Sequence, residues 1–302
     1  MTLILGFEDY LPQAEKLSHC LSVPIKQVNL HQFPDGETKV TLPDKLPRQV
    51  IICRSLNQPN DKLIELIITA SAARDQGAEH ITLVAPYLCY MRQDKAFNTG
   101  EAISQKIIGK LLSEYFDSVI TIDPHLHRIK NLTEAIPNKA AITLHASQAI
   151  TNFLQQKFKQ PIIIGPDEES EQWVKAIAAP HQWQYTIASK QRFSDREVEV
   201  SFSKSDLPNT IKLNLAEQDI IIVDDIASTG KTLEQAVIQI KQQNPKSISI
   251  IVTHAFFVDS ALKHLNSLGV KNIWSSDSIS HPSNAFSIID TVATQLKMMK
   301  LV

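Results

Sequence analysis

Short apolar runs alternate with amphipathic segments along almost the whole chain. The runs are nearly continuous and rich in Ile and Val, which is typical of strands buried on both faces of a parallel sheet. The segments between them carry apolar residues at helical spacing, so they predict helices that cover such a sheet. The predicted strands are residues 49–53, 80–85, 119–122, 161–164, 220–223 and 247–252, and the predicted helices are residues 61–76, 104–115, 146–157, 171–178, 232–243 and 260–268.

This strand–helix pattern occurs twice, over about residues 1–140 and again over about residues 160–290. It predicts an α/β fold with two similar Rossmann-like domains, each a mainly parallel sheet flanked by helices and joined by right-handed crossovers. We expect domains over residues 1–142 and 143–302, with the junction near residues 137–143 and a last helix able to pack back on the first domain. In such sheets ligands bind beyond the carboxyl ends of strands, so polar clusters at those ends are the candidate sites.

Composition narrows the class of protein. A length of 302 residues suits two domains, and a hydrophobic content of 43% argues against disorder. The net charge of −2 argues against general binding to nucleic acid or to a membrane surface. The three cysteines are far apart and odd in number, which favours reduced thiols over a disulfide or zinc framework. With no basic leader and no apolar stretch of membrane-spanning length, we expect a cytoplasmic protein.

The most informative stretch is residues 220–232. Its four apolar residues run into Asp224 and Asp225, and a loop of hydroxyl residues with one glycine leads into the next helix. Backbone N–H groups and the helix dipole at such a loop attract an anion, while the acids could accept from sugar hydroxyls or hold a divalent cation. The stretch therefore predicts a sugar-phosphate site. A P-loop is strongly disfavoured because Asp225 stands where its first glycine is required. The alternative to a sugar-phosphate site is a strand that ends in two solvated acids and is followed by an ordinary capped helix.

Two cations, Lys190 and Arg192, share one face of an extended segment and could bind a polyphosphate together. Residues 194–197 after them predict the turn of a mobile hairpin. An exposed hairpin with alternating charges is the alternative.

Residues that follow two other predicted strands suit a metal ion or phosphate. His125 and His127 come after residues 119–122, where a packed or surface histidine is the alternative. Asp167 comes after residues 161–164 and could join a magnesium site. A helix N-cap cluster is the alternative there, and it is strong for Glu168 and Glu169.

Two clusters in the first half suit a nucleotide. Residues 33–37 predict a turn whose acids could accept from an amino group or ribose, with Phe33 available to stack on a base. Arg92 and Gln93 follow the strand at residues 80–85 and carry donors suited to phosphate or purine edges. Each signal is nonspecific by itself.

In order and spacing, these clusters resemble the ribose-phosphate diphosphokinase family, also called PRPP synthetase, over about residues 3–289. The short segment at residues 93–104 looks most like the archaeal-type branch. The family has two phosphoribosyltransferase-type domains. It transfers the diphosphoryl group of ATP, with Mg²⁺, to the 1-hydroxyl of ribose 5-phosphate, and the products are 5-phosphoribosyl diphosphate (PRPP) and AMP.

The resemblance also implies roles for single residues, with ATP and ribose 5-phosphate as the partners and a homo-oligomer as the assembly. Phe33, Asp35, Gly36, Glu37, Arg92 and Gln93 would bind ATP; His125 and Asp167 would serve the magnesium; Lys190 and Arg192 would be catalytic, with Arg192 also holding substrate phosphate; Asp224 and Asp225 would bind the ribose hydroxyls; and Ser228, Thr229, Gly230, Lys231 and Thr232 would bind the 5-phosphate.

Two other functions remain open. A PRPP-using phosphoribosyltransferase would share residues 223–232, but it usually needs one such domain and would leave the nucleotide-type clusters without a purpose. A catalytically weak regulatory subunit of the same family is the other, because Glu168, Glu169 and Lys231 depart from the residues common in the family.

Overall fold

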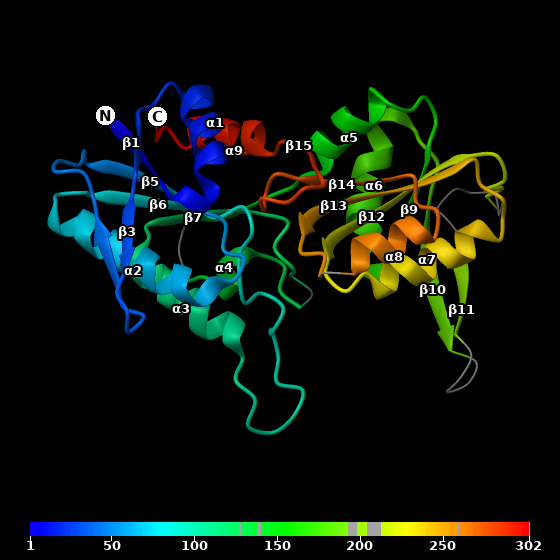
Figure 1. Ribbon diagram of the computed structural model, residues 1–302, viewed down its shortest axis with the longest axis horizontal. Coiled ribbons are helices and arrows are strands. Elements are labelled where there is room, and N and C mark those ends of the chain that lie inside the picture. Colours follow the sequence, from blue (N-terminus) through cyan, green and yellow to red (C-terminus); the bar gives the residue numbers. More distant parts are fainter. Residues whose placement is uncertain (127, 138–139, 193–197, 204–212, 259, 302) are drawn as a thin grey trace. The chain divides into compact units, whose positions relative to one another are not determined.

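The computed structural model describes residues 1–126, 128–137, 140–192, 198–203, 213–258 and 260–301 (Figure 1). The chain forms two compact units. The first contains Met1–His145, Ser278–Ser280 and Ile288–Val302, and the second contains Ala146–Asp277 and His281–Ser287. The domain limits predicted from the sequence, 1–142 and 143–302, concern independently folding domains and stay a prediction.

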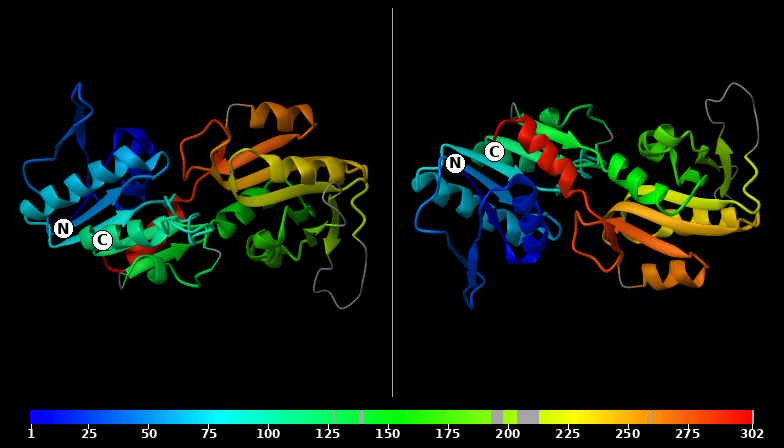
Figure 2. Two further views of the ribbon diagram at one scale, coloured as in Figure 1. Left: turned by 90° about the horizontal axis from the view of Figure 1, so that it is seen from below. Right: turned by 90° about the horizontal axis from the view of Figure 1, so that it is seen from above.

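The first unit is built on a six-stranded sheet in the order β2-β1-β5-β6-β7-β8, in which every pair is parallel. Its apolar strands are buried because helices cover both faces. Helices α1 and α9 pack against each other, whereas α2 and α3 belong to the other side (Figures 1 and 2). The strands are β1 (Thr2–Gly6), β2 (Ile25–Gln27), β5 (Gln49–Cys53), β6 (His80–Val84), β7 (Ser118–Ile122) and β8 (Ala140–Leu144), with the separate hairpin β3 (Asn29–Gln32) and β4 (Thr38–Thr41); the helices are η1 (Glu8–Tyr10), α1 (Leu11–Leu21), α2 (Pro59–Asp75), α3 (Ser104–Tyr115), α4 (Leu132–Ala135) and α9 (Ile289–Met298).

The second unit has a seven-stranded sheet in the order β11-β10-β9-β12-β13-β14-β15. Among the described strands of this sheet, β10 and β11 form the one antiparallel pair. The strands are β9 (Ile162–Gly165), β10 (Tyr185–Arg192), β11 (Val198–Ser203), β12 (Asp219–Ala227), β13 (Ser247–Ala255), β14 (Asn272–Ser276) and β15 (Asn284–Phe286); the helices are α5 (Ser147–Gln155), η2 (Glu168–Ser170), α6 (Glu171–Ala178), η3 (Ala179–His181), α7 (Lys231–Lys241) and α8 (Ala261–Ser267).

The two sheets share one topology. If β11 is set aside, β10-β9-β12-β13-β14-β15 repeats the order β2-β1-β5-β6-β7-β8. In both, the first strand leads through a short 3-10 helix into an α-helix, and the order reverses between that strand and the next sheet strand. Such a reversal opens a crevice at the carboxyl ends of the two neighbouring strands. The crevices are expected between β1 and β5 and between β9 and β12.

The predicted α/β class and the repeated strand–helix pattern are confirmed, since every predicted strand and helix is present with bounds shifted by a few residues. The junction expected near residues 137–143 stays a prediction, but part of that stretch is a strand. Residues from Ala140 onward form β8, which pairs with β7 from Ser118 to Ile122. Among the described residues, no helix combines the length and the apolar character that crossing a bilayer would require.

Helix α3 packs closely on the segment that carries α4. A Cβ atom on Gly109 would lie 1.9 Å from the carbonyl oxygen of Ala135. Because that oxygen belongs to the backbone, the contact cannot be relieved by a side-chain rotation. We therefore expect Gly109→Ala to lower the free energy of unfolding by about 1–3 kcal/mol, despite the better helix propensity of alanine.

Urea or thermal unfolding measures this difference. Lys110→Ala, at an exposed position of the same helix, is the control and should change stability by less than about 0.5 kcal/mol. Equal stability of the Gly109 variant and wild type would contradict the close packing.

Candidate active site

In the second unit, three acids gather at the reversal of strand order. Strands β9 and β12 pair with Ile164 opposite Ile222, so Asp167, Asp224 and Asp225 all lie just beyond this register. Asp167 caps the 3-10 helix η2, because its side chain accepts from the Ser170 N–H at 3.3 Å. The N-cap alternative is thus realised for Asp167, and the same residue also acts electrostatically on Asp224.

The last residue of β9, Gly165, packs too closely on its neighbours to carry a side chain. A Cβ atom on Gly165 would lie 2.1 Å from the Ser170 Oγ and 2.8 Å from the Ile187 Cδ1. That hydroxyl in turn donates to the carbonyl of Asp167. The close packing of Gly165 on Ser170 therefore fixes where Asp167 stands.

The neighbouring carboxylates raise the proton affinity of Asp224. The pKa of Asp224 lies well above its usual value, first because of burial and then because of the charges of Asp225 and Asp167. The Asp225 N–H donates to Asp224 Oδ1 at 3.0 Å, which only partly offsets this. A cation or a set of hydroxyl donors would relieve the repulsion, so the donor set fits a divalent ion with oxygen ligands. Within the described part of the chain, however, no three metal-ligating side chains form a complete metal site.

The loop after β12 offers an anion site next to these acids. Helix α7 begins at Lys231, and Gly230 before it has a φ of 74°, in the left-handed region that glycine tolerates. The Gly230 carbonyl accepts the Glu234 N–H at 2.8 Å, so the preceding N–H groups of the first turn point outward. The Ser228 carbonyl accepts from the Val258 N–H at 3.2 Å, which ties the loop to the segment that follows β13. Thr229 and Lys231 are exposed.

Strand β10 carries the two predicted catalytic cations. It runs parallel to β9, with Ile187 opposite Gly165, and then continues as a hairpin with β11. In the register of this hairpin, Lys190 pairs with Val200 and Arg192 pairs with Val198. The turn predicted at residues 194–197 lies outside the described residues.

In the first unit, residues 33–37 form the predicted turn between β3 and β4. The Phe33 N–H donates to the Glu37 carbonyl at 2.7 Å, and the Glu37 N–H donates to Asp35 Oδ1 at 3.2 Å. Gly36 has a φ of +94° and Phe33 is 40% exposed. The turn thus presents an aromatic ring and acids to solvent.

The loops with the remaining predicted residues are neighbours. Arg92 and Gln93 follow β6, and His125 follows β7, whose strands pair with Val84 opposite Ile120. Arg92 is exposed, and the Gln93 carbonyl accepts from the Gln105 N–H at the start of α3. His127, the second histidine of the motif, lies outside the described residues.

One contact near His125 was not predicted from the sequence, that between Asp123 and His145. The buried Asp123 has a φ of 37° and contacts His145 Nδ1 through its Oδ1 at 2.9 Å. This hydrogen bond raises the pKa of His145, although burial works against it. No local pattern joins two residues that meet only because β7 and β8 are neighbours in the sheet.

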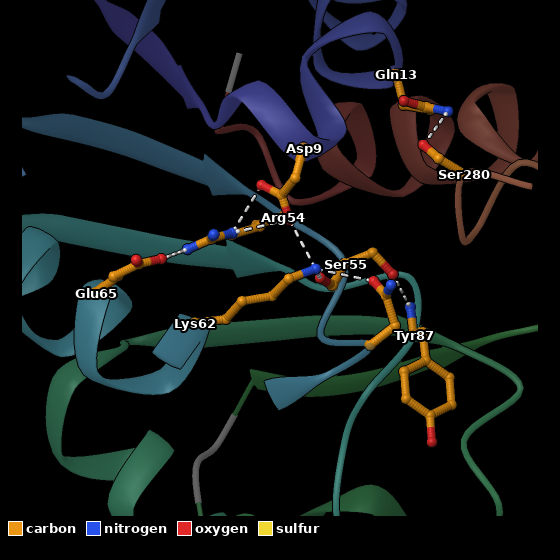
Figure 3. Close-up of polar contacts among 9 residues, drawn as sticks. Asp9, Gln13, Arg54, Ser55, Lys62, Glu65, Tyr87 and Ser280 are labelled. Atoms are coloured by element: carbon orange, nitrogen blue, oxygen red, sulfur yellow. Dashed lines mark hydrogen bonds and ion pairs between the residues drawn. The ribbon is translucent and has the colours of Figure 1, made fainter. Parts of the chain in front are cut away.

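An ion-pair network at the reversal between β1 and β5 was not predicted either (Figure 3). The Arg54 side chain is 6% exposed; it donates to Asp9 Oδ1 at 3.0 Å and to Glu65 Oε2 at 2.5 Å. Lys62 Nζ contacts Asp9 Oδ2 at 2.6 Å and the Ser55 carbonyl at 2.9 Å. The sequence does contain one indication of this network: Arg54 directly follows the buried apolar strand β5.

The shared sheet topology and the strand, acid pair, loop and helix at residues 220–232 define an α/β protein of the phosphoribosyltransferase type. A family model described as the phosphoribosyl transferase domain matches residues 131–289, and one described as the N-terminal domain of ribose phosphate pyrophosphokinase matches residues 2–115. The chain belongs to the ribose-phosphate pyrophosphokinase family. The predicted family and fold class are confirmed.

Relatives match along most of the chain. The ribose-phosphate pyrophosphokinase of Methanopyrus kandleri is 28% identical over 294 residues, or 96% of this chain and 97% of that one. The enzyme of the same name from Saccharolobus solfataricus is 33% identical, over 88% of this chain and 89% of that one. Both are archaeal, in agreement with the predicted branch. A crystal structure of phosphoribosylpyrophosphate synthetase from Mycobacterium smegmatis has the same fold, with a TM-score of 0.84 at 19% identity over 99% of each chain.

The repulsion at Asp224 predicts that Asp224→Asn is more stable than wild type at neutral pH. Above the pKa of an unfolded Asp, about 3.9, the unfolded chain releases a proton that folded Asp224 retains, so the free energy of unfolding of wild type falls as pH rises. Asparagine does not ionise, so the free energy of unfolding of the variant does not fall with pH for this reason. Thermal unfolding without ligands should show a higher Tm for the variant at pH 7–8, and the difference should shrink toward about pH 4.

Asp219→Asn on the same strand is the matched control with the opposite sign. Burial acts to raise the pKa of Asp219, but hydrogen bonds from Lys246 and Ser247, at 2.8 and 2.6 Å, outweigh it and lower the pKa. Its loss should therefore reduce the Tm at neutral pH. If Asp224→Asn also reduced the Tm there, carboxylate repulsion would not govern this site.

Proposed function

We propose that the protein is a ribose-phosphate diphosphokinase, which transfers the diphosphoryl group of ATP to the 1-hydroxyl of ribose 5-phosphate and releases AMP. The observation that carries this proposal is the match of proteins named ribose-phosphate pyrophosphokinase across both halves of the chain. A phosphoribosyltransferase alone would not explain the N-terminal domain model at residues 2–115. We also propose a cytoplasmic homo-oligomer, as the resemblance implies.

Ribose 5-phosphate would bind in the second unit. Asp224 and Asp225 would accept hydrogen bonds from the ribose hydroxyls, which relieves the repulsion between their carboxylates. The 5-phosphate would be bound by N–H groups and hydroxyls of residues 228–232, at the start of an eleven-residue helix. Lys231 is exposed and adds a positive charge to the same loop.

ATP would bind through residues of the first unit. Arg92 and Gln93 would donate to the nucleotide, and the exposed Phe33 would stack on a base beside Asp35, Gly36 and Glu37. As the resemblance implies, His125 in the first unit and Asp167 in the second would each serve the magnesium that neutralises polyphosphate charge. Asp167 is half-buried and already oriented by Ser170, whereas Glu168 and Glu169 are exposed. This supports an active enzyme over a weakened regulatory subunit.

Lys190 and Arg192 would act on the transferred group. Diphosphoryl transfer needs in-line positioning and neutralisation of charge more than covalent catalysis. Two cations two residues apart on a strand, as Lys190 and Arg192 are on β10, could together stabilise the charge that develops on the phosphoryl and leaving oxygens. Delivery of the cations only after both substrates bind would limit hydrolysis of ATP.

The direct test is to incubate the purified protein with ATP, Mg²⁺ and ribose 5-phosphate and to quantify AMP and PRPP. We expect both products in equal amounts. No turnover at any magnesium concentration would refute the proposal and favour the regulatory subunit. Consumption of added PRPP with a nucleobase, without formation of PRPP, would favour a phosphoribosyltransferase.

We predict that Lys190→Ala lowers kcat on the order of 10²-fold or more, with little change in the KM for either substrate, because Lys190 would act mainly in the transition state. Steady-state kinetics of PRPP formation measures this. Lys175→Ala, which removes an exposed lysine paired with Glu171 on α6, is the control and should retain wild-type kinetics. A Lys190 variant that kept most of its turnover would refute the catalytic role of this lysine.

A further inference from the structure

One ion pair joins the two loops that carry the nucleotide-side residues of the first unit. The Asp94 side chain is 2% exposed, and Arg128 lies against it with a 47% exposed side chain. Arg128 Nη1 donates to Asp94 Oδ1 at 2.6 Å and to Oδ2 at 2.7 Å. A carboxylate this deeply buried needs its counter-ion, because burial of an unpaired charge costs several kcal/mol. Loss of Arg128 should therefore displace the segment that holds Asp94.

The two partners of this ion pair lie next to the residues predicted to bind the nucleotide. Asp94 directly follows Arg92 and Gln93 in the loop after β6, and Arg128 follows His125 in the loop after β7. The other side of the first loop is held by α3, since the Gln105 N–H donates to the Gln93 carbonyl and Gln105 Nε2 donates to the Met91 carbonyl, both at 3.2 Å. Arg128 thus supplies the attachment on the side that faces the loop of His125.

We propose that Arg128 is a positioning residue for ATP: through Asp94 it holds Arg92 and Gln93 at a fixed distance from His125. This inference rests on the proposed function, in which these three residues serve the nucleotide and its magnesium. The guanidinium contacts both carboxylate oxygens through the single nitrogen Nη1. A lysine ammonium, as one point charge, can make a similar contact. Direct contact between Arg128 and the polyphosphate is the competing role, and the experiment separates the two.

The experiment compares Arg128→Gln with the double variant Asp94→Asn/Arg128→Gln. The single variant leaves a buried carboxylate unpaired, and we expect it to raise the KM for ATP about tenfold or more, with the KM for ribose 5-phosphate unchanged. The double variant removes the buried charge and should recover most of the affinity for ATP. Arg128→Lys keeps a cation beside Asp94 and should stay within about threefold of wild type.

Binding of a non-hydrolysable ATP analogue, measured by calorimetry on the full chain, gives a readout that does not depend on turnover. Its Kd should follow the same order as the KM for ATP. If wild type bound the analogue but formed no PRPP, the proposed function would fail while the comparison of Kd values would still decide the role of Arg128. Arg48→Gln breaks the exposed pair of Arg48 with Glu79 at the amino ends of β5 and β6; it is the matched control and should match wild type.

Three results would overturn the inference. The first is an unchanged affinity for ATP in Arg128→Gln. The second is an equal rise in the KM values for ATP and ribose 5-phosphate, which indicates a general loss of structure. The third is a double variant as weak as Arg128→Gln together with a weak Arg128→Lys, which indicates that the guanidinium itself contacts the polyphosphate. Because the double variant leaves no buried charge unpaired, it also decides the question if Arg128→Gln does not fold: near-wild-type affinity for ATP supports the positioning role, and weak affinity overturns it.

Discussion

Strand order reverses once in each sheet, between β1 and β5 and between β9 and β12, and this constraint decides where charge gathers in the molecule. Helices on opposite faces leave the carboxyl ends of these neighbouring strands uncovered, so two loops converge there. In the second unit the converging loops bring Asp167 to Asp224 and Asp225. In the first unit they bring Arg54 to Asp9 and Glu65.

The local parts of the site could be predicted from the sequence. A buried apolar strand, two acids, a hydroxyl loop with Gly230 and an amphipathic helix are continuous in the chain, so residues 220–232 reveal their structure without knowledge of the fold. The same holds for the turn at residues 33–37, whose glycine and acids set its conformation. The roles of the individual site residues stay predictions, and the turn at residues 194–197 lies outside the described part of the chain.

Contacts that depend on sheet order could not be predicted in this way. Arg54 meets Asp9 only because β1 and β5 are neighbours, and His145 meets Asp123 only because β8 joins the edge of the sheet beside β7. Strand β8 is short and half-buried, and two of its residues are alanines. Its sequence therefore only weakly indicates a strand, and it resembles a junction between two domains. The raised pKa of Asp224 also depends on Asp167, a residue of another strand end.

The Arg54 network has a consequence for how the two halves respond to substrate. The two cations of this network, Arg54 and Lys62, are balanced by Asp9 and Glu65. The counter-ions at this crevice are therefore side chains of the protein itself. At the equivalent crevice of the second unit, the balancing groups would arrive with the ligand. Ligand binding stabilises a folded state in proportion to the logarithm of ligand concentration over Kd. Binding of ribose 5-phosphate would therefore stabilise the second half through this crevice, whereas the β1–β5 crevice of the first half needs no ligand to balance its charges.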